Sequence, residues 1–283
     1  MTESAVNSTA GENKWGDLGV RALSAVLLIP AVLLDIWLGG IWFELFAAFL
    51  GVLIAHEWTI IGHGRSSAQF ALHAAAAMSA AFLPGDIGVF PSLAVIVVLT
   101  ALSIVAMAWS KRPKNLWTYV GVPYVALPVL SLVQLRQDAT WGVHAIMWLM
   151  LMVWATDTFA YFAGRMIGGA KLAPLLSPKK TWAGLLGGMA GAAVISVVYA
   201  LWFLPTWQML ALVAAALAAL AQGGDIFESA FKRFHDVKDS GALIPGHGGV
   251  LDRVDGLLVA VVAAAFVGFA RDANSLARGL LLW

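Results

Sequence analysis

The segment SAFKRFHDVKDSGALIPGHGGVLDRVDG, residues 229–256, is hydrophilic and lies between two strongly apolar stretches. Ten of the chain's 17 basic and 16 acidic residues fall between positions 225 and 255. A concentration of charge directly beside apolar sequence indicates a polar segment held at the edge of a membrane. We therefore expect an integral membrane protein whose chemistry takes place at a membrane surface.

Composition supports this class. Hydrophobic residues make up 61% of the chain and charged residues 12%, against roughly 45–50% and about 25% in soluble domains. A net charge of +1 argues against nucleic acid as a partner, because phosphate binding requires a strongly basic surface. The absence of cysteine excludes disulfides, thiol nucleophiles and cysteine-ligated zinc.

Hydropathy predicts an all-α, polytopic bundle in the lipid bilayer. A spanning helix needs about 20 mostly apolar residues, and the chain has about nine such stretches: 18–38, 42–61, 68–84, 91–109, 117–135, 142–163, 182–204, 208–224 and 255–270. We expect residues 1–17 to form a disordered polar leader, 18–140 to form N-terminal membrane helices, and 141–283 to form a C-terminal catalytic membrane region.

The positions of Lys and Arg predict the orientation. With nine spans and a cytoplasmic N-terminus, 14 of the 17 cations fall on the inner side, and only Arg136, Arg271 and Arg278 fall outside. Two polar patches, residues 164–181 and 225–255, then face the cytoplasm, where nucleotides are found.

The acidic residues at the ends of two apolar stretches are candidate metal ligands. In a helix, Asp225, Glu228, Ser229 and Lys232 occupy positions i, i+3, i+4 and i+7 and share one face. Asp252 and Asp255 begin the next span with the same i, i+3 spacing. Carboxylates at such positions cost insertion energy and usually have a partner. Oxygen ligands without cysteine suit Mg²⁺, which one or two carboxylates hold together with substrate phosphates.

Two further motifs suggest contacts with phosphate. The glycine-rich stretch PGHGG can present backbone N–H groups to an anion, and it includes His247, Gly248 and Gly249. In the earlier polar patch, the lysines of SPKKT, residues 177–181, could meet a triphosphate, and Asp157 lies within the sixth span. GRMIGGAK is not a nucleotide P-loop, because Ala170 replaces the required Lys and no strand precedes it. Glu57, in the second span, is read as an interhelical contact or a catalytic group.

The segment 229–256 resembles the signature of phosphatidate cytidylyltransferases, also called CDP-diacylglycerol synthases. The match rests on Ser229, Lys232, Arg233, Lys238, Asp239, Gly241, Pro245, His247, Gly248, Gly249, Asp252, Arg253 and Asp255. GRMIGGAKLAPLLSPKKTW and Glu57-Trp58 are also similar to family elements. Two positions depart from the pattern: Ala183 stands where the family usually has Glu, and Phe159 where it often has Gly.

The resemblance implies transfer of a cytidylyl group from CTP to phosphatidic acid. It implies a catalytic set of Asp225, Ser229, Lys232, Arg233, Lys238, Asp239, His247, Asp252, Arg253 and Asp255. Substrate contacts are expected from Ser177, Lys179, Lys180, Thr181, Gly248 and Gly249. Mg²⁺, with room for a second cation, is expected at Asp225, Asp252, Asp255 and Glu228. The expected location is a bacterial-type inner membrane, with the site on the cytoplasmic side.

Alternatives remain at this point. A related CTP-dependent lipid kinase is the nearer alternative. A polytopic transporter would need ionisable groups near the bilayer midplane and repeat symmetry, and the sequence shows neither. A CDP-alcohol phosphotransferase is excluded, because Asp255-Gly256 is not followed by its Ala-Arg pair. The sequence leaves open the acyl-chain preference and whether the chain forms a homodimer.

Overall fold

The computed structural model describes residues 26, 29–109, 116–241, 243 and 248–283. Within them, eight helices are long and apolar enough to cross a membrane: α2 (Gly40–His63), α3 (Ser67–Ile87), α4 (Val89–Ala108), α5 (Leu116–Arg136), α6 (Gly142–Met166), α7 (Trp182–Phe203), α8 (Gln208–Phe234) and α9 (Leu251–Arg271). A shorter apolar helix covers Ile29–Leu38. The prediction of a polytopic helical membrane protein is confirmed; most of the first predicted span, 18–38, lies outside the described residues or in this short helix.

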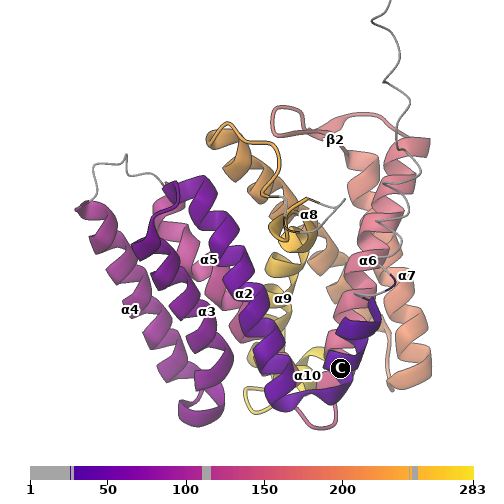
Figure 1. Ribbon diagram of the computed structural model, residues 1–283. Helices are drawn as coiled ribbons and strands as arrows, with labels where there is room; N and C mark the ends of the chain where they lie inside the picture. Colours follow the sequence, from indigo (N-terminus) through magenta and orange to yellow (C-terminus); the bar gives the residue numbers. More distant parts are fainter. Residues whose placement is uncertain (1–25, 27–28, 110–115, 242, 244–247) are drawn as a thin grey trace, which may run out of the picture.

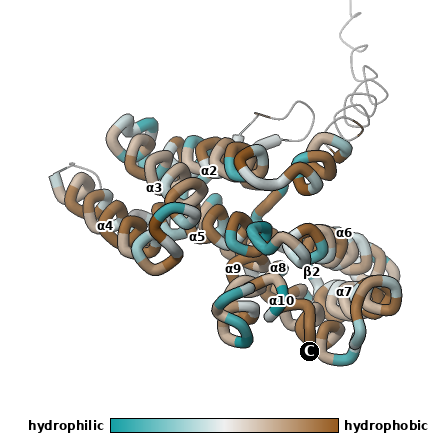
Figure 2. Tube along the Cα trace, turned by 90° about the horizontal axis from the view of Figure 1, so that it is seen from below, coloured by the Kyte–Doolittle hydropathy of each residue, from teal (hydrophilic) through white to brown (hydrophobic). Residues whose placement is uncertain are grey.

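The helices form two groups joined by a central pair. Figure 1 shows α2 to α5 on one side and α6 and α7 on the other, with α8 and α9 between them. In Figure 2 the helices are hydrophobic along most of their length, as expected for surfaces that face lipid or each other. A short helix, α10 (Leu276–Leu281), packs on α9 at the end of the chain.

Helices α6 and α7 approach closely because α7 presents glycines to its neighbour. A Cβ atom at Gly187 would lie 2.2 Å from Ala163 Cβ, and one at Gly188 would lie 3.0 Å from the carbonyl oxygen of Thr156. Small residues on the facing sides of two membrane helices allow the helices to pack backbone against backbone. The close packing fixes the position of α6, which carries Asp157, relative to the start of α7.

A small β-hairpin connects α6 to α7 and is the exception to the all-α prediction. Strands β1 (Lys171–Ala173) and β2 (Ser177–Thr181) pair antiparallel, with Lys171 opposite Thr181. The Thr181 hydroxyl then accepts a hydrogen bond from Gly184 N at 3.0 Å and caps α7. The hairpin therefore holds the lysines of β2 at the end of the α6–α7 pair.

Helix α8 extends ten residues beyond the predicted end of its span at position 224. Hydropathy alone ends the span before these charged residues, but the spacing of Asp225, Glu228, Ser229 and Lys232 predicted that residues 225–234 continue it as a helix, and they do. The predicted common face of Asp225, Glu228 and Lys232 is thereby confirmed. At 1.5 Å per residue, Asp225 lies about 13 Å along the helix axis from the last residue, Phe234, so the acidic face is recessed below the end of the helix.

Candidate active site

Lys232 joins the acidic faces of α8 and α9. Its Nζ lies 3.0 Å from Glu228 Oε2 on the same helix and 2.6 Å from Asp252 Oδ1 on α9. Glu228 is almost fully buried, and its other oxygen has no hydrogen-bond partner among the described residues. A half-buried ammonium between two carboxylates offsets much of their repulsion, and so α8 and α9 can place their acids side by side.

Asp252 has both carboxylate oxygens engaged by the protein. Oδ1 binds Lys232, while Oδ2 accepts hydrogen bonds from Ser240 N at 2.9 Å and Gly249 N at 3.1 Å. These bonds tie the loop after α8 to the first turn of α9. Asp252 therefore holds the loop in place as well as facing the acidic cluster.

Glu57 of α2 holds the same loop from the opposite side. Its carboxylate accepts hydrogen bonds from Val250 N and Leu251 N, both at 2.8 Å, and from the Ser240 hydroxyl at 3.0 Å. A negative charge at a helix N-terminus satisfies backbone N–H groups that lack helical partners. Of the two interpretations of Glu57, the structure therefore favours a contact between distant segments, one that positions the start of α9.

Two adjoining cavities meet at Asp225. A cavity of about 250 Å³ is lined by the acids of α8 and α9 together with Asp157 of α6. A larger cavity of about 550 Å³ is lined by the β2 lysines Lys179 and Lys180 and by Arg165 of α6. Both cavities share Asp157, Gln222 and Asp225, so an acid-rich compartment opens into a cation-rich one.

The ion pair between Lys180 and Asp225 lies at this junction. Lys180 Nζ is 2.6 Å from Asp225 Oδ2 and also donates to the carbonyl oxygen of Gln222 at 3.2 Å. The side-chain amide nitrogen of Gln222 is buried without a hydrogen-bond partner among the described residues. The two polar patches predicted from sequence are therefore in direct contact.

Asp255 faces the acid-rich cavity from the second turn of α9. Its carboxylate lies beside those of Asp225 and Glu228 and interacts electrostatically with both, and Asp255 Oδ1 accepts a hydrogen bond from Gly256 N at 2.8 Å. Neighbouring carboxylates repel one another unless cations or protons intervene. The cluster is thus suited to bind positive charge.

Not every predicted residue lines these cavities. Arg253, Lys179 and Thr181 do, whereas neither of these two cavities is lined by Ser229, Arg233, Lys238, Asp239, Ser177, Gly248 or Gly249. Arg233, in the last turn of α8, donates to the carbonyl oxygen of Val237 at 3.1 Å, in the loop that follows. Gly249 contributes its backbone N–H to Asp252. His247 lies outside the described residues.

Some residues of the site were not predicted. Residues without a predicted role also line the larger cavity: Arg165, Lys171, Tyr161 and Gln222. The hydroxyl of Tyr124 on α5 is also buried, and it interacts electrostatically with Asp225, Glu228 and Asp255. Arg165 could have been predicted as a basic residue two helical turns after Asp157. No local feature of the sequence distinguishes Tyr124.

A metal ion would depend on substrate for part of its coordination. Among the described residues, no group of three or more His, Asp or Glu side chains is arranged as a complete metal site. Asp225 and Asp255, with the unpartnered oxygen of Glu228 nearby, nevertheless supply the hard oxygen donors that Mg²⁺ takes together with phosphates. The donor set fits Mg²⁺.

A polytopic helical bundle, with clustered carboxylates opening into a lysine-lined cavity at one edge, defines a membrane enzyme of phosphate chemistry. A profile of the Cytidylyltransferase family matches residues 19–270. The phosphatidate cytidylyltransferase of Brucella abortus is 38% identical over 255 residues, which cover 89% of this chain and 93% of that protein. The phosphatidate cytidylyltransferase of Staphylococcus haemolyticus is 32% identical over 249 residues, which cover 84% of this chain and 94% of that protein. The chain belongs to the phosphatidate cytidylyltransferase family.

Proposed function

We propose that this chain transfers the cytidylyl group of CTP to phosphatidic acid, giving CDP-diacylglycerol and pyrophosphate, in the two joined cavities. Family membership supports the reaction. The location of the reaction is supported by the 2.6 Å ion pair between Lys180 and Asp225, because this pair lies where the cation-rich and acid-rich cavities meet. A nucleotide triphosphate and a metal-bound phosphate would be adjacent at that point.

The reaction makes modest chemical demands on the protein. The nucleophile is a phosphate monoester oxygen, which is mostly deprotonated at pH 7 because its second pKa is about 6. It attacks the α-phosphorus of CTP; a new P–O bond forms while the bond to the bridging oxygen breaks, and pyrophosphate leaves with the electron pair. No general base is needed, so the protein's contribution is alignment and charge neutralisation.

The larger cavity is the better place for the triphosphate. Its lining contains Arg165, Lys171, Lys179 and Lys180, against the carboxylates of Asp157 and Asp225 at the shared wall. Charge-assisted hydrogen bonds from such cations to phosphate oxygens are about twice as strong as neutral ones. On CTP binding, Lys180 would exchange its contact with Asp225 for one with phosphate.

The smaller cavity requires added positive charge. Its lining holds five carboxylates, those of Asp157, Asp225, Glu228, Asp252 and Asp255, but only the cations Lys232 and Arg253. Two polyanionic substrates cannot approach this cavity without cations to neutralise it. We assign Asp225 and Asp255 as the residues that would hold Mg²⁺, with Glu228 beside them. When bound, the ion would neutralise phosphate oxygens and fix their orientation.

Asp252 receives a different role in this proposal. The sequence grouped it with the metal ligands, but its oxygens already accept bonds from Lys232, Ser240 N and Gly249 N. We therefore assign it to positioning Lys232 and the loop. The cytoplasmic location of the site rests on the distribution of Lys and Arg and on the presence of CTP in that compartment.

The test is incubation of the purified chain with Mg²⁺, phosphatidic acid and CTP labelled in either the α- or the γ-phosphate. Cytidylyl transfer places the α label in the lipid product and releases the γ label in pyrophosphate. A γ label in the lipid, with release of CDP, would show a lipid kinase instead and would overturn the proposal.

A further inference from the structure

Tyr124 of α5 carries a buried hydroxyl that the proposed reaction does not use. This hydroxyl has no hydrogen-bond partner among the described residues. Leaving a buried polar group without a partner is costly, and few groups in folded proteins are left in this way without a functional reason. Phenylalanine would supply the same ring without this cost. The hydroxyl of Tyr124 is therefore a candidate for a role beyond packing.

Aromatic neighbours fix the ring of Tyr124. Its centroid lies 4.7 Å from the ring of Trp58 on α2 and 5.3 Å from the ring of Phe227 on α8. Trp58 is in turn stacked on Phe231 of α8, with the ring centroids 3.9 Å apart. Because close-packed side chains resist displacement, these contacts hold the Tyr124 ring in one position beside α8.

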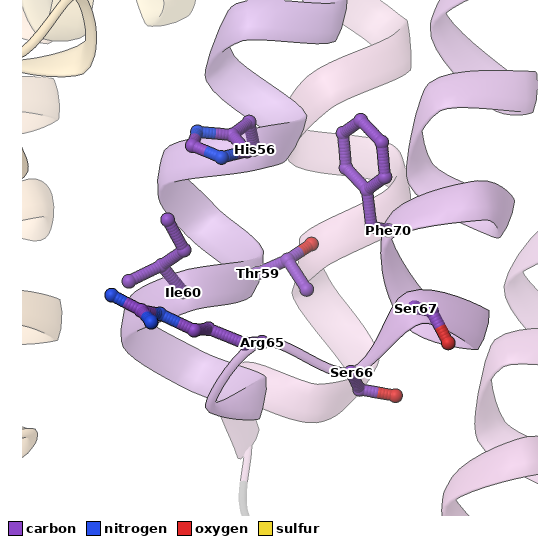
Figure 3. Close-up of a pocket in the computed structure, with 7 residues that line it drawn as sticks. All are labelled: His56, Thr59, Ile60, Arg65, Ser66, Ser67 and Phe70. Carbon is purple, nitrogen blue, oxygen red and sulfur yellow. The ribbon is translucent and has the colours of Figure 1, made fainter. Parts of the chain in front are cut away.

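Helix α2, which supplies Trp58, is itself held from another side by α3. His56 of α2 and Phe70 of α3, both drawn in Figure 3, are in edge-to-face contact with their ring centroids 5.9 Å apart. Trp58 follows His56 by two residues, which is about 200° round a helix of 3.6 residues per turn. Trp58 therefore projects away from this contact, and it is completely buried. The ring of Tyr124 thus rests against a side chain that is fixed in its turn.

The Tyr124 hydroxyl approaches the acidic cluster from the side away from the cavities. The hydrophobic cluster around the ring includes Val254 of α9 and Phe227 of α8, and these two residues directly precede Asp255 and Glu228 in the chain. The hydroxyl interacts electrostatically with both carboxylates. Tyr124 itself lines neither cavity of the proposed active site. Its influence on the acids is therefore exerted through the protein interior.

Glu228 has the complementary deficiency. Its carboxylate is almost fully buried; Oε2 lies 3.0 Å from Lys232 Nζ, whereas Oε1 has no hydrogen-bond partner among the described residues. A tyrosine hydroxyl can donate a hydrogen bond, and a carboxylate oxygen can accept one. Tyr124 thus offers a donor and Glu228 an acceptor in the same buried region, where bulk water cannot satisfy either.

We propose that Tyr124 is a positioning residue, whose hydroxyl donates to the Glu228 carboxylate and thereby holds the acids of α8 and α9 in place for Mg²⁺. This inference rests on the proposed function, in which Asp225 and Asp255 would hold the ion with Glu228 beside them. Lys232 already fixes one oxygen of Glu228, and a donor at the other oxygen would leave the carboxylate a single orientation. Partners that orient metal-binding carboxylates typically contribute 10- to 100-fold to metal affinity or activity.

The test is Tyr124→Phe, which removes the hydroxyl and keeps the ring. The measurement is the Mg²⁺-dependent rise in unfolding temperature of the full chain in detergent, with phosphatidic acid present and CTP omitted so that no turnover occurs. We expect the midpoint of the Mg²⁺ titration to rise about tenfold. The unfolding temperature without Mg²⁺ should not fall, because the hydroxyl has no partner to lose. In the complete reaction the Mg²⁺ requirement should shift equally, with kcat near the wild-type value at saturating Mg²⁺.

Two controls separate this role from packing. Tyr119→Phe removes the hydroxyl of an exposed tyrosine on the same helix and should leave the titration unchanged. In a Glu228→Gln background, Tyr124→Phe should have no further effect, because the residue through which it acts is already altered.

An unchanged midpoint in Tyr124→Phe would overturn the proposal. A lower unfolding temperature without Mg²⁺ would do the same, since it would show a purely structural role, and so would a tenfold effect that persists in Glu228→Gln. Absence of any Mg²⁺-dependent rise in the wild type would overturn the metal assignment together with this inference. A wild-type chain that shows the rise but makes no CDP-diacylglycerol would overturn the proposed reaction alone.

Discussion

Glu57 accepts a hydrogen bond from Leu251 N at 2.8 Å, across 194 positions of sequence, and thereby joins α2 to the N-terminus of the helix that carries Asp252 and Asp255. Glu57 lines neither of the two cavities of the proposed active site. We therefore expect it to affect activity indirectly, through the position of α9. This relationship explains why a carboxylate is buried inside an otherwise apolar span.

Replacing Glu57 by Gln should displace the loop before α9. The amide NH₂ group would face backbone N–H donors, and at least one buried donor would lose its acceptor, at a cost of about 1–3 kcal/mol. We expect turnover to fall roughly 10- to 100-fold, as for groups that orient catalytic ligands, together with a lower unfolding temperature. Glu44→Gln on the same helix is the control and should change neither. Normal turnover of Glu57→Gln would show that α9 keeps its position without this contact.

Gly249→Ala should have a similar effect for a steric reason. A Cβ atom there would lie 1.9 Å from Ser240 Oγ and 2.8 Å from Glu57 Oε2, so the loop would have to move. We expect large losses of both turnover and thermal stability. Gly223→Ala is the matched control, because a Cβ atom on this α8 residue meets nothing within 4 Å, and Ala is favoured over Gly in a helix by about 1 kcal/mol. Similar behaviour of the two variants would contradict the close packing described at Gly249.

Asparagine substitutions should distinguish the proposed metal ligands, Asp225 and Asp255, from Asp252, which holds the loop before α9. Asp225→Asn and Asp255→Asn keep shape but lose charge, so we expect turnover to require at least about tenfold more Mg²⁺. Asp252→Asn should instead lower thermal stability and turnover while leaving the Mg²⁺ dependence unchanged. Mg²⁺ titrations of activity on monodisperse protein measure this difference. An unchanged Mg²⁺ requirement in Asp225→Asn and Asp255→Asn would remove them from the metal assignment.

The acidic face of α8 could be predicted from sequence because it depends on local spacing. Asp225, Glu228 and Lys232 recur at i, i+3 and i+7, and a helix places such residues together whatever surrounds it. Hydropathy alone would have ended α8 at position 224, since it treats Glu228 and Lys232 as unfavourable, although their 3.0 Å ion pair lets them remain helical. A hydropathy scale scores each residue by itself, so it does not detect that two charged residues form an ion pair.

Contacts between distant segments could not be predicted from local spacing or hydropathy. The role of Glu57 depends on where residues 240–251 return in the fold, and a single sequence does not contain that information. The β-hairpin was missed because strands of three and five residues show no clear alternation. For Lys180 and Asp225, the distribution of charge predicted only that both lie on the same side of the membrane. It did not predict that they are in contact.

Phe159, which departs from the family pattern, is accommodated by Gly191. A Cβ atom at Gly191 would lie 2.4 Å from Phe159 Cγ, so the ring packs directly on the α7 backbone. Gly191→Ala alone should therefore separate α6 from α7 and reduce both stability and turnover. The double variant Phe159→Ala/Gly191→Ala should recover much of the stability, because the ring that clashes is gone. Additive losses in this double-mutant cycle would contradict direct packing of the two residues.

Side-specific labelling tests the shared orientation of the two polar patches. The chain has no native cysteine, so a single introduced cysteine reports without background. Lys179 and Lys238 are exposed, and neither forms an ion pair within the described part of the chain, so Lys179→Cys and Lys238→Cys should leave the fold intact. In sealed inverted vesicles an impermeant maleimide should label both, and in right-side-out vesicles only Arg278→Cys should react. Labelling of positions 179 and 238 from opposite sides would separate β2 from the loop before α9. That result would contradict the ion pair between Lys180 and Asp225 on which the proposed site depends.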